Sequence, residues 1–482
     1  MSPEIIRTRY APSPTGMMHV GNLRTALYEY LIAKSMGGSF ILRIEDTDQA
    51  RQVDGAVDII YKTLHSVGLQ HDEGPDIGGA YGPYVQSERR DLYRPYAEQL
   101  VEAGKAYRCF CSRERLEELR ASSEGGGGYD RHCRDLPQEE IQALLDSGTP
   151  HVIRQKMPIQ GSTTFIDAVY GSITVDHREL EDQVLLKTDG YPTYNFANVI
   201  DDHLMAITHV VRGSEYLSST PKYNLLYEAF GWKIPTYVHL PLIVGSDGRK
   251  LSKRHGSTSF EALVAEGYLP VAIVNAIALL GWCPKDNREL FTLEELSQAF
   301  SIDGISKSPS VFDYDKLAWF NAEHIRAMDK DAFLNWIRPS LEQAFGGPVK
   351  EENLLAELLQ PRLIRLNDLP DMVRFLTTQQ NFDLELFQNK KNKMDLQKTA
   401  GLLPKIRGTL AALTVWDRTA VHDSLQLLTS ENDLKTGQVM WPLRIALSGQ
   451  TVTPGGAIEI AVVLGQSETL ARLDNAIARI SA

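Results

Sequence analysis

Two short segments of the sequence carry side chains suited to binding phosphate groups. The first, "HVGN", spans His19 to Asn22 and leads into a predicted helix. The N-terminus of a helix presents free backbone N–H groups and a partial positive charge, and both favour phosphate oxygens. Gly21 allows close approach of a ring such as adenine, and His19 can donate a hydrogen bond to a phosphate that gains charge in a transition state. Ordinary helix capping is the alternative interpretation of these residues.

The second segment, "GSDGRKLSKRHG", spans Gly245 to Gly256 and follows a predicted strand. A basic loop flanked by glycines can fold over a triphosphate. Lys250 and Lys253 would then neutralise the charge that develops on pyrophosphate as it leaves. Lysine ammonium groups are compact point charges on flexible side chains, which suits this role. A charged, solvated surface turn is the alternative interpretation of this segment taken alone.

A strand–helix–strand unit must position the first segment. The apolar pattern predicts a strand at Thr8 to Ala11, a helix from about Asn22, and a second strand at Phe40 to Ile44. Gly37-Gly38 supplies the end of the helix. Such a unit predicts a parallel sheet, and ligands bind these sheets at the carboxyl ends of the strands. The expected fold class is therefore α/β.

Beyond this unit the chain is predicted to contain an insertion, further strands and a helical half. The insertion includes a flexible glycine run at Gly125 to Gly128, and from about Thr258 the apolar spacing is mostly helical. Short β-like runs, strand-like sequence and parallel strands are expected at Val152–Ile153, Ile173–Val175, Val184–Asp202, Ala206–Val211 and Leu240–Val244.

Length and composition bound the class of protein. A chain of 482 residues exceeds what one core usually serves, so at least two domains are expected. The formal net charge of -12 argues against indiscriminate coating of nucleic acid, but it leaves room for a specific RNA partner. Four cysteines, no signal-peptide pattern and no apolar run long enough for a membrane span predict a cytoplasmic protein without a membrane partner.

Together, the two segments resemble the signatures of class I aminoacyl-tRNA synthetases in order, spacing and context. The strings "RYAPSPTGMMHVGNLRTAL", "FILRIEDTD", "DGYPTYNFANVIDDH" and "KLSKRHG" resemble the glutamyl-tRNA synthetase branch in particular. The resemblance continues in "YGPYVQSERRDLY", "YDRHCRDL", "KLAWFNAEHI" and "GQVMWPLRIALSGQTVTPGG", and so covers nearly the whole chain. Asn22 and Leu251 depart from the general class signature at positions that vary in this branch.

The resemblance implies a fold and a division into domains. It implies a Rossmann-like parallel-sheet catalytic domain with an α+β insertion, followed by an all-helical C-terminal anticodon-binding region. The catalytic domain would comprise residues 1–93 and 190–256, and the insertion, residues 94–189, would bind the acceptor stem. Residues 257–326 would form a helical domain that contacts the stem, and residues 327–482 the anticodon-binding region.

The resemblance also implies roles for individual residues. Arginines 9 and 212 suit a substrate with a side-chain carboxylate, because a guanidinium binds a carboxylate through two hydrogen bonds. His19, Lys250 and Lys253 are the implied catalytic residues. The implied ATP contacts are His19, Gly21, Glu215, Lys250, Ser252, Lys253 and Arg254. The implied glutamate contacts are Arg9, Ala11, Ser13, Glu45, Tyr194, Asn198 and Arg212, with Glu45 at the α-ammonium group.

Three of the four cysteines lie close together in the insertion. Cys109, Cys111 and Cys133 are soft ligands of the kind that structural zinc sites use, and such sites need four ligands. Tyr129 or His132 is the candidate for the fourth. Some members of the family carry a similar Cys-x-Cys and Tyr-x-x-x-Cys pattern. Three reduced cysteines without a metal are the alternative.

The activity implied by the resemblance is ATP-dependent, Mg²⁺-dependent ligation of L-glutamate to the 3′ end of tRNA(Glu) through a glutamyl-adenylate, by a monomer. One alternative is a non-discriminating enzyme that also charges tRNA(Gln). The non-enzymatic alternative is a tRNA-binding protein on a decayed synthetase scaffold. A nucleotidylyltransferase, or a short paralogue that glutamylates a modified tRNA base, would lack the long helical half.

Overall fold

The computed structural model describes residues 5–48, 52–122, 128–378 and 381–482. The predicted glycine loop, Gly125 to Gly128, lies outside the described residues except for Gly128. The chain forms two compact units. The first comprises Met1–Val264 and Pro270–Tyr314, and the second comprises Ala265–Leu269 and Asp315–Ala482.

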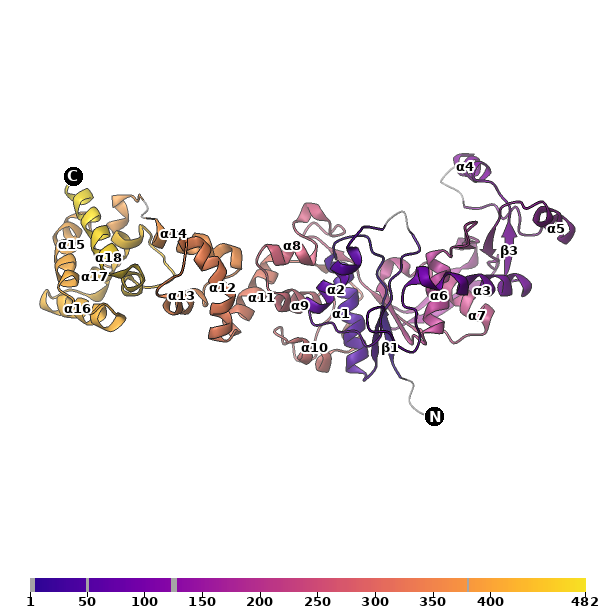
Figure 1. The fold of residues 1–482 in the computed structure, drawn as a ribbon, viewed down its shortest axis with the longest axis horizontal. Helices are drawn as coiled ribbons and strands as arrows, with labels where there is room; N and C mark the ends of the chain where they lie inside the picture. The colour runs from indigo at the N-terminus through magenta and orange to yellow at the C-terminus, as the bar shows by residue number, and fades with distance from the viewer. Residues whose placement is uncertain (1–4, 49–51, 123–127, 379–380) are drawn as a thin grey trace. The chain divides into compact units, whose positions relative to one another are not determined.

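The predicted strand–helix–strand unit is confirmed. Strands β1 (Arg7–Tyr10) and β2 (Ser39–Leu42) pair in parallel, and helix α1 (Val20–Ser35) connects them and lies beside β1 in Figure 1. The helix begins two residues earlier than predicted, because His19 acts as its N-cap and accepts a hydrogen bond from the Gly21 amide. Most of α1 is buried, which explains why its sequence is apolar on nearly every side.

A second group of strands continues the sheet. Strands β8 (His209–Gly213) and β9 (Thr236–Leu240) pair in parallel, with helix α7 (Thr220–Phe230) between them in sequence. The amide of Thr208, just before β8, donates to the carbonyl of Arg7 in β1 at 3.0 Å. Strands β1 and β8 are therefore neighbours, and the sheet continues from β1 to β2 on one side and from β8 to β9 on the other. Such a switch point between adjacent strands is where open α/β sheets bind ligands.

The hairpin of β5 (Ser162–Asp167) and β6 (Gly171–Asp176) joins the same group, because β5 pairs in parallel with β9. The β-like run at 173–175 is thus confirmed within β6, whereas β5 had no sequence prediction. A separate antiparallel sheet contains β3 (Ala106–Cys109), β4 (Val152–Gln155) and β7 (Val184–Leu186). Helices α3 (Arg90–Glu102), α4 (Arg113–Ser122) and α5 (Gln138–Asp146) belong to this part of the chain.

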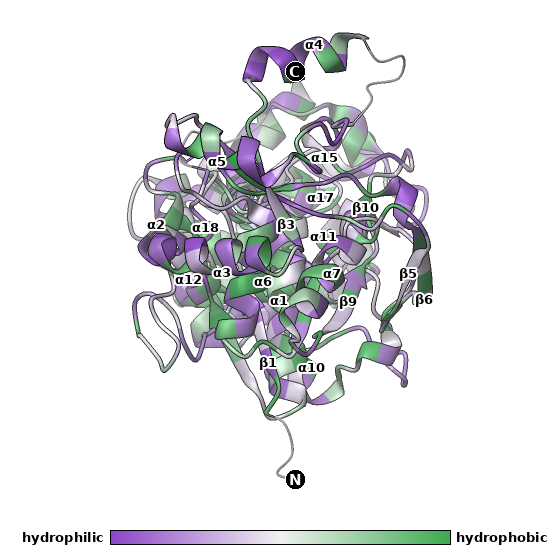
Figure 2. Cartoon of the chain, turned by 90° about the vertical axis from the view of Figure 1, so that its right-hand side faces the viewer, coloured by the Kyte–Doolittle hydropathy of each residue, from purple (hydrophilic) through white to green (hydrophobic). Residues whose placement is uncertain are grey.

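Two strand predictions require correction. Most of the segment predicted as strand-like, Val184 to Asp202, is not extended, because residues 194–204 form helix α6 (Tyr194–Leu204). The helix buries Phe196, Ala197 and Ile200 on one face, and Figure 2 shows green and purple segments along it. The strand predicted at Leu240 to Val244 is divided. Thr236–Leu240 forms β9, and β10 (Ile243–Val244) pairs instead with β11 (Ser310–Val311).

The prediction of a helical C-terminal half is confirmed. In the first unit, α8 (Phe260–Ala265), α9 (Pro270–Ala278) and α10 (Leu293–Ala299) follow the strands. The described part of the second unit contains α11 (Tyr314–Ala327), α12 (Lys330–Phe345), α13 (Glu352–Leu359), α14 (Leu369–Thr377), α15 (Leu396–Ala411), α16 (Arg418–Glu431), α17 (Thr436–Ser448) and α18 (Ala457–Ser481).

The buried guanidinium of Arg472 connects three helices of this second unit. It extends from α18 and donates to the backbone carbonyls of Phe375 and Leu376 at the end of α14, and of Leu447 at the end of α17. The last carbonyls of a helix have no partner within the helix, so a buried cation satisfies them well. Among the described helices of the chain, none has the length and apolar character needed to cross a membrane.

Candidate active site

A cavity of about 510 Å³ opens at the carboxyl ends of β1, β8 and β9. The turn after β1, the start of α1, Glu45 shortly after β2 and the loop after β10 all contribute to its wall. Of the predicted site residues, the cavity is lined by Arg9, Ala11, Ser13, His19, Gly21, Glu45, Tyr194, Arg212, Glu215 and Lys250. The fold therefore brings both predicted motifs to one site.

The first motif is anchored at the start of α1. The Nδ1 atom of His19 accepts a hydrogen bond from the Gly21 amide at 3.1 Å, so Nε2 is the nitrogen left for a ligand. Burial, and then the positive charge of Lys250, lower the pKa of His19 below its ordinary value. The imidazole is therefore neutral at physiological pH, with its proton on Nε2. A neutral imidazole of this kind donates a hydrogen bond to phosphate without adding a full charge.

The second motif forms a hairpin-like loop beyond β10. Val244 and Lys250 form an antiparallel bridge, and the amide of Leu251 donates to Ile243 at 3.1 Å. Asp247 pairs with Arg254 at 3.1 Å and with His255 at 3.0 Å, which ties the two sides of the loop together. Lys250 lines the cavity, whereas Ser252 and Arg254 do not. The backbone of Lys253 is helical, but its side chain lies outside the described part of the chain.

Backbone hydrogen bonds join the first motif to the segment that follows the second. The amide of Val20 donates to Thr258, and the amide of Phe260 donates to Met18, each at 2.9 Å. His19 and Ser259 form the antiparallel bridge between these contacts. The segment that follows the basic loop thus runs alongside the segment that enters α1. This contact fixes where Lys250 and His19 lie relative to each other.

Arg9 is neutralised by protein carboxylates. Its Nε donates to Asp202 at 2.9 Å, and its Nη1 lies 3.2 Å from Glu29. These two carboxylates outweigh the effect of burial and raise the pKa of Arg9. Because Asp202 and Glu29 already satisfy its charge, Arg9 has less capacity than predicted to attract a further carboxylate. Only Nη2 makes no hydrogen bond among the described residues.

Arg212 is buried without a carboxylate partner among the described residues. It is 6% exposed, and its Nε atom is buried with no hydrogen-bond partner in the described part of the chain. Its Cζ atom lies 5.1, 4.4 and 5.4 Å from the ring centroids of Tyr216, Tyr223 and Tyr237. Such rings stabilise a cation only in part, and a buried charge normally has an ion-pair partner. Arg212 is therefore well suited to bind an anionic ligand in the cavity.

Glu45 supplies a negative charge to the same cavity. Its Oε1 accepts hydrogen bonds from Arg43 at 2.9 Å and from Gln86 at 3.5 Å, which fixes the carboxylate. Burial raises the pKa of Glu45, and the adjacent charge of Arg43 opposes that effect. No described residue donates to Oε2, so one carboxylate oxygen stays available for a cationic ligand group.

The remaining predicted residues have different surroundings. Tyr194 lines the cavity, and burial raises the pKa of its phenol well above the ordinary value. Asn198 is buried and donates to the Tyr194 carbonyl at 2.9 Å. It does not line the main cavity, but it contacts a small space that Arg212, Tyr223 and Tyr237 also border. Its contact with the backbone of Tyr194 positions that residue.

Sequence reasoning missed several charged groups of the site. Asp202, Glu29 and Arg43 form the ion-pair network around Arg9, and Arg24 lines the cavity while donating to the backbone of Leu280. A charged residue inside an apolar helix or strand, such as Glu29 in α1, is the signal that identifies this kind of network. The partners of Arg9 and Asp202 are far away in sequence and were not predictable, whereas Arg43 also pairs with Glu45 two residues later.

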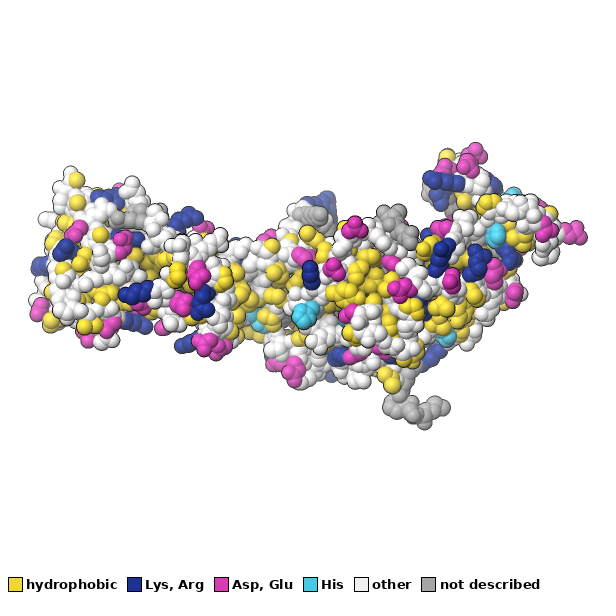
Figure 3. All heavy atoms as spheres, viewed as in Figure 1, with side chains coloured by type: hydrophobic (Ala, Val, Ile, Leu, Met, Phe, Trp, Pro, Cys, Tyr) yellow, Lys and Arg dark blue, Asp and Glu magenta, His cyan; other side chains and the backbone are white. Residues whose placement is uncertain are grey.

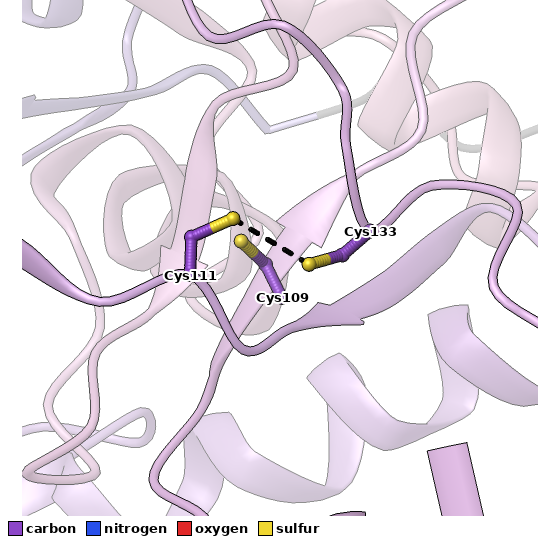
Figure 4. Close-up of side chains that lie close together, drawn as sticks. All are labelled: Cys109, Cys111 and Cys133. Atoms are coloured by element: carbon purple, nitrogen blue, oxygen red, sulfur yellow. Dashed lines mark hydrogen bonds between the residues drawn. The ribbon is translucent and has the colours of Figure 1, made fainter. Parts of the chain in front are cut away.

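The predicted metal ligands are brought together. The sulfurs of Cys109, Cys111 and Cys133 lie within 4.8 Å of one another, and Figure 4 shows the three side chains converging. The hydroxyl of Tyr129 lies 3.2 Å from the Cys109 sulfur and 3.8 Å from the Cys111 sulfur. His132 is not part of this group. Hydrogen bonding between the two thiols lowers the pKa of Cys109 and raises the pKa of Cys133, so the pair shares one proton.

Several cationic side chains of the second unit are paired with acidic neighbours. Arg365 pairs with Asp368, Arg374 with Asp371, and Arg407 with Asp474. Basic and acidic side chains are interspersed on the face that Figure 3 shows, without a continuous basic stripe on that face. Surface ion pairs of this kind are weak, so an RNA phosphate could compete for these arginines.

Comparison with known proteins gives concordant matches along the chain. Residues 5–319 match the family model for the catalytic domain of class I tRNA synthetases (E and Q), and residues 316–477 match an anticodon binding domain. A glutamate--tRNA ligase of Clostridium novyi is 54% identical over 479 residues, covering 98% of each chain. One of Clostridium tetani is 52% identical, covering 97% of this chain and 96% of the relative.

The solved structures agree with these matches. A glutamate tRNA ligase from Elizabethkingia meningosepticum, described as being in complex with its amino acid, superposes with a TM-score of 0.89. It is 37% identical, and the match covers 99% of this chain and 100% of that one. The glutamate-tRNA synthetase of Elizabethkingia anophelis matches with the same TM-score and identity.

Proposed function

We propose, from the premise that this chain belongs to the class I tRNA synthetases of the glutamate and glutamine (E and Q) type, that it is a glutamate--tRNA ligase. The premise rests on a match to about two thirds of the chain for the catalytic model and on relatives that span its whole length. The observation that supports glutamate as the substrate concerns Arg212. It is a buried cation on the wall of the cavity, without an ion-pair partner among the described residues.

The choice of glutamate follows from the charges of the cavity. The side-chain carboxylate of glutamate would pair with Arg212, and its α-ammonium group would contact Glu45. Glutamine offers Arg212 only a neutral amide and would leave the buried guanidinium unpaired, which costs several kcal/mol by order of magnitude. Arg9, Ala11, Ser13 and Tyr194 complete the glutamate site, with Asn198 acting through Tyr194.

ATP would occupy the part of the cavity between the two motifs. His19 and the amides at the start of α1 would contact its phosphates, and Gly21 would lie under the adenine. Glu215 and Lys250 line this part, and Ser252, Lys253 and Arg254 would reach it when the loop closes over the nucleotide. Mg²⁺, bound with ATP, would supply further charge neutralisation at the phosphates.

The reaction has two steps. The α-carboxylate of glutamate attacks the α-phosphate of ATP, which forms glutamyl-adenylate and releases pyrophosphate. A hydroxyl of the terminal adenosine of tRNA then attacks the activated carboxyl, which forms glutamyl-tRNA and releases AMP. No protein side chain serves as nucleophile. His19, Lys250 and Lys253 act by positioning the phosphates and stabilising their charge.

The tRNA contacts follow the predicted division of the chain. We assign the acceptor stem to residues 94–189, further stem contacts to 257–326, and the anticodon to the helices of 327–482. The match of residues 316–477 to an anticodon binding domain supports the last assignment. We expect a monomer in the cytoplasm, where the four free cysteines would stay reduced.

A structural zinc ion would fit the cysteine cluster. Cys109, Cys111 and Cys133 would supply three sulfurs, and the nearby Tyr129 oxygen would be the fourth ligand. A tetrahedral site of this kind is closed to substrate, so its role would be to hold the β3–β4–β7 region together. No step of the reaction involves it.

The test is direct aminoacylation. Purified protein, ATP and Mg²⁺ are incubated with radiolabelled glutamate and with tRNA(Glu) or tRNA(Gln), and radiolabelled glutamine serves as the control amino acid. Charging of tRNA(Glu) alone would establish a discriminating enzyme, and charging of both tRNAs a non-discriminating one. If folded protein charges neither, the proposed function is wrong and a non-catalytic tRNA-binding role takes its place.

A further inference from the structure

The guanidinium of Arg212 forms a hydrogen bond with a buried threonine, Thr220. Its Nη2 donates to Oγ1 of Thr220 at 3.5 Å, a long hydrogen bond to a fully buried hydroxyl at the start of α7. The tyrosine rings around Arg212 attract its charge but do not fix its rotation, because cation–π attraction has little directional preference within the ring plane. Thr220 is therefore a group that can orient the fork of the guanidinium.

The hydroxyl of Thr220 is itself oriented by two acceptors. It donates to the Tyr216 carbonyl at 2.9 Å, and the Nε2 atom of His239 lies 3.3 Å from the same oxygen. A hydroxyl has one hydrogen and two lone pairs. Because both neighbours are acceptors, they share the single hydrogen, which lies closer to the Tyr216 carbonyl, and the lone pairs are left for Arg212.

Asp167 makes His239 an acceptor. The Nδ1 atom of His239 lies 2.6 Å from Oδ2 of Asp167, and both side chains are fully buried. A carboxylate accepts only, so the imidazole proton is on Nδ1 and the lone pair is on Nε2. Asp167 is fixed in turn by the amides of Val169 and Tyr170, at 2.9 and 2.8 Å.

We propose that Asp167, His239 and Thr220 form a positioning relay that orients Arg212 towards the side-chain carboxylate of the amino-acid substrate. The three residues come from β5, β9 and α7, so the positions of these elements fix the orientation of Arg212 in the cavity. Burial lowers the pKa of His239, consistent with a neutral imidazole. The inference rests on the proposed function, because it assumes that Arg212 binds glutamate.

The first test compares Thr220→Val with Thr220→Ser in aminoacylation at saturating tRNA. Valine keeps the shape but removes the hydroxyl. We expect the KM for glutamate to rise about tenfold, the effect of one hydrogen bond to a charged group, with the KM for ATP changed less than about twofold. Serine should restore the KM for glutamate. A purely structural role would affect both substrates, and serine would not restore one of them selectively.

His239→Asn provides the second test. Asparagine keeps a donor near the position of Nδ1 for Asp167 but lacks the Nε2 atom that faces Thr220. The KM for glutamate should rise, and the double variant with Thr220→Val should be no worse than Thr220→Val alone, because both changes interrupt one relay. If Thr220→Val does not fold, His239→Asn alone decides, through the same split between the KM values for glutamate and ATP.

Thr399→Val is the matched control. Thr399 is equally buried and donates to the carbonyl four residues earlier, as Thr220 does, but it lies in the second unit. Its KM for glutamate should match that of the wild type. An unchanged KM for glutamate in Thr220→Val, or equal rises for both substrates, would overturn the relay while leaving the proposed function intact. Failure of the wild type to use glutamate would instead overturn the proposed function.

Discussion

His19 and Lys250 come from distant parts of the chain and line the same cavity, where the charge of Lys250 adds to burial in lowering the pKa of His19. The backbone bridge between His19 and Ser259 accounts for their proximity, since it holds the end of the basic loop against the start of α1. The two predicted phosphate-binding motifs therefore form one electrostatic unit before any ligand binds.

The first prediction concerns this coupling. Replacing Lys250 by Met should raise the pKa of His19 only part of the way to its ordinary value, because burial, the larger cause, remains. NMR titration of the His19 ring measures the change. Lys250→Arg keeps the charge and should leave the pKa lowered. An identical titration of His19 in Lys250→Met and the wild type would contradict the coupling.

The second prediction concerns stability in acid. Because the pKa of His19 is lower in the folded protein, the unfolded chain binds the proton first. This group therefore destabilises the protein as pH falls below the unfolded pKa, and the loss is complete below the folded pKa. His19→Asn removes the titration and keeps a cap acceptor for the Gly21 amide. Urea unfolding at neutral and mildly acidic pH should show a smaller acid loss in this variant than in the wild type.

The third prediction contrasts the two arginines of the cavity wall. Arg9→Met removes the partner of Asp202 and Glu29 and should lower the free energy of unfolding by about 3–5 kcal/mol. Arg212→Met removes a buried cation without an ion pair among the described residues. It should change the free energy of unfolding by less than about 1 kcal/mol, since hydrophobic replacement of a buried charge is often neutral.

For activity, we expect the larger effect from Arg212→Met, which is the variant with the smaller effect on stability. Arg212→Met should raise the KM for glutamate about 100-fold, because a bidentate ionic contact is lost, while the KM for ATP stays near that of the wild type. Denaturant unfolding and steady-state aminoacylation measure the two quantities. If Arg212→Met lowers stability as much as Arg9→Met does, Arg212 has a structural role that its contacts do not reveal.

The fourth prediction concerns the geometry of the basic loop. A Cβ atom at Gly245 would lie 2.6 Å from the ring of His255, which is braced by Asp247. Gly245→Ala should therefore displace the loop and lower kcat about tenfold or more, with little change in melting temperature. Gly408→Ala is the control, since nothing lies within 4 Å of its Cβ and alanine favours a helix interior. Equal kcat values for Gly245→Ala and the wild type would show that the loop tolerates the methyl group.

The fifth prediction concerns the cysteine cluster. Protein purified without chelator should contain about one zinc ion per chain, and Tyr129→Phe should weaken zinc binding at least about tenfold. Metal analysis and competition with a chromogenic chelator provide the two measurements. His132→Ala is the matched control and should retain zinc. A wild-type content far below one ion per chain would mean that the three thiols are simply reduced cysteines.

Local patterns in the sequence determined the elements that build the site. The strand–helix–strand unit was predictable, and the two candidate motifs and the cysteine spacing could be recognised, because each depends on residues close together in the chain. The helix at Tyr194–Leu204 was missed because its β-branched and aromatic residues follow turn signals that suit a strand equally well. Its helical character comes from packing against α7 and β7, which a local pattern does not contain.

Only the tertiary structure decided how the charges are paired. Arg9 and Arg212 looked equivalent in sequence, as two arginines suited to one carboxylate. In the fold, Asp202 and Glu29 neutralise Arg9, while Arg212 has tyrosine rings and Thr220 around it. Electrostatic pairing depends on distances between residues that are remote in sequence, so the sequence determines which charges exist and the fold decides which of them has no ion-pair partner among the described residues.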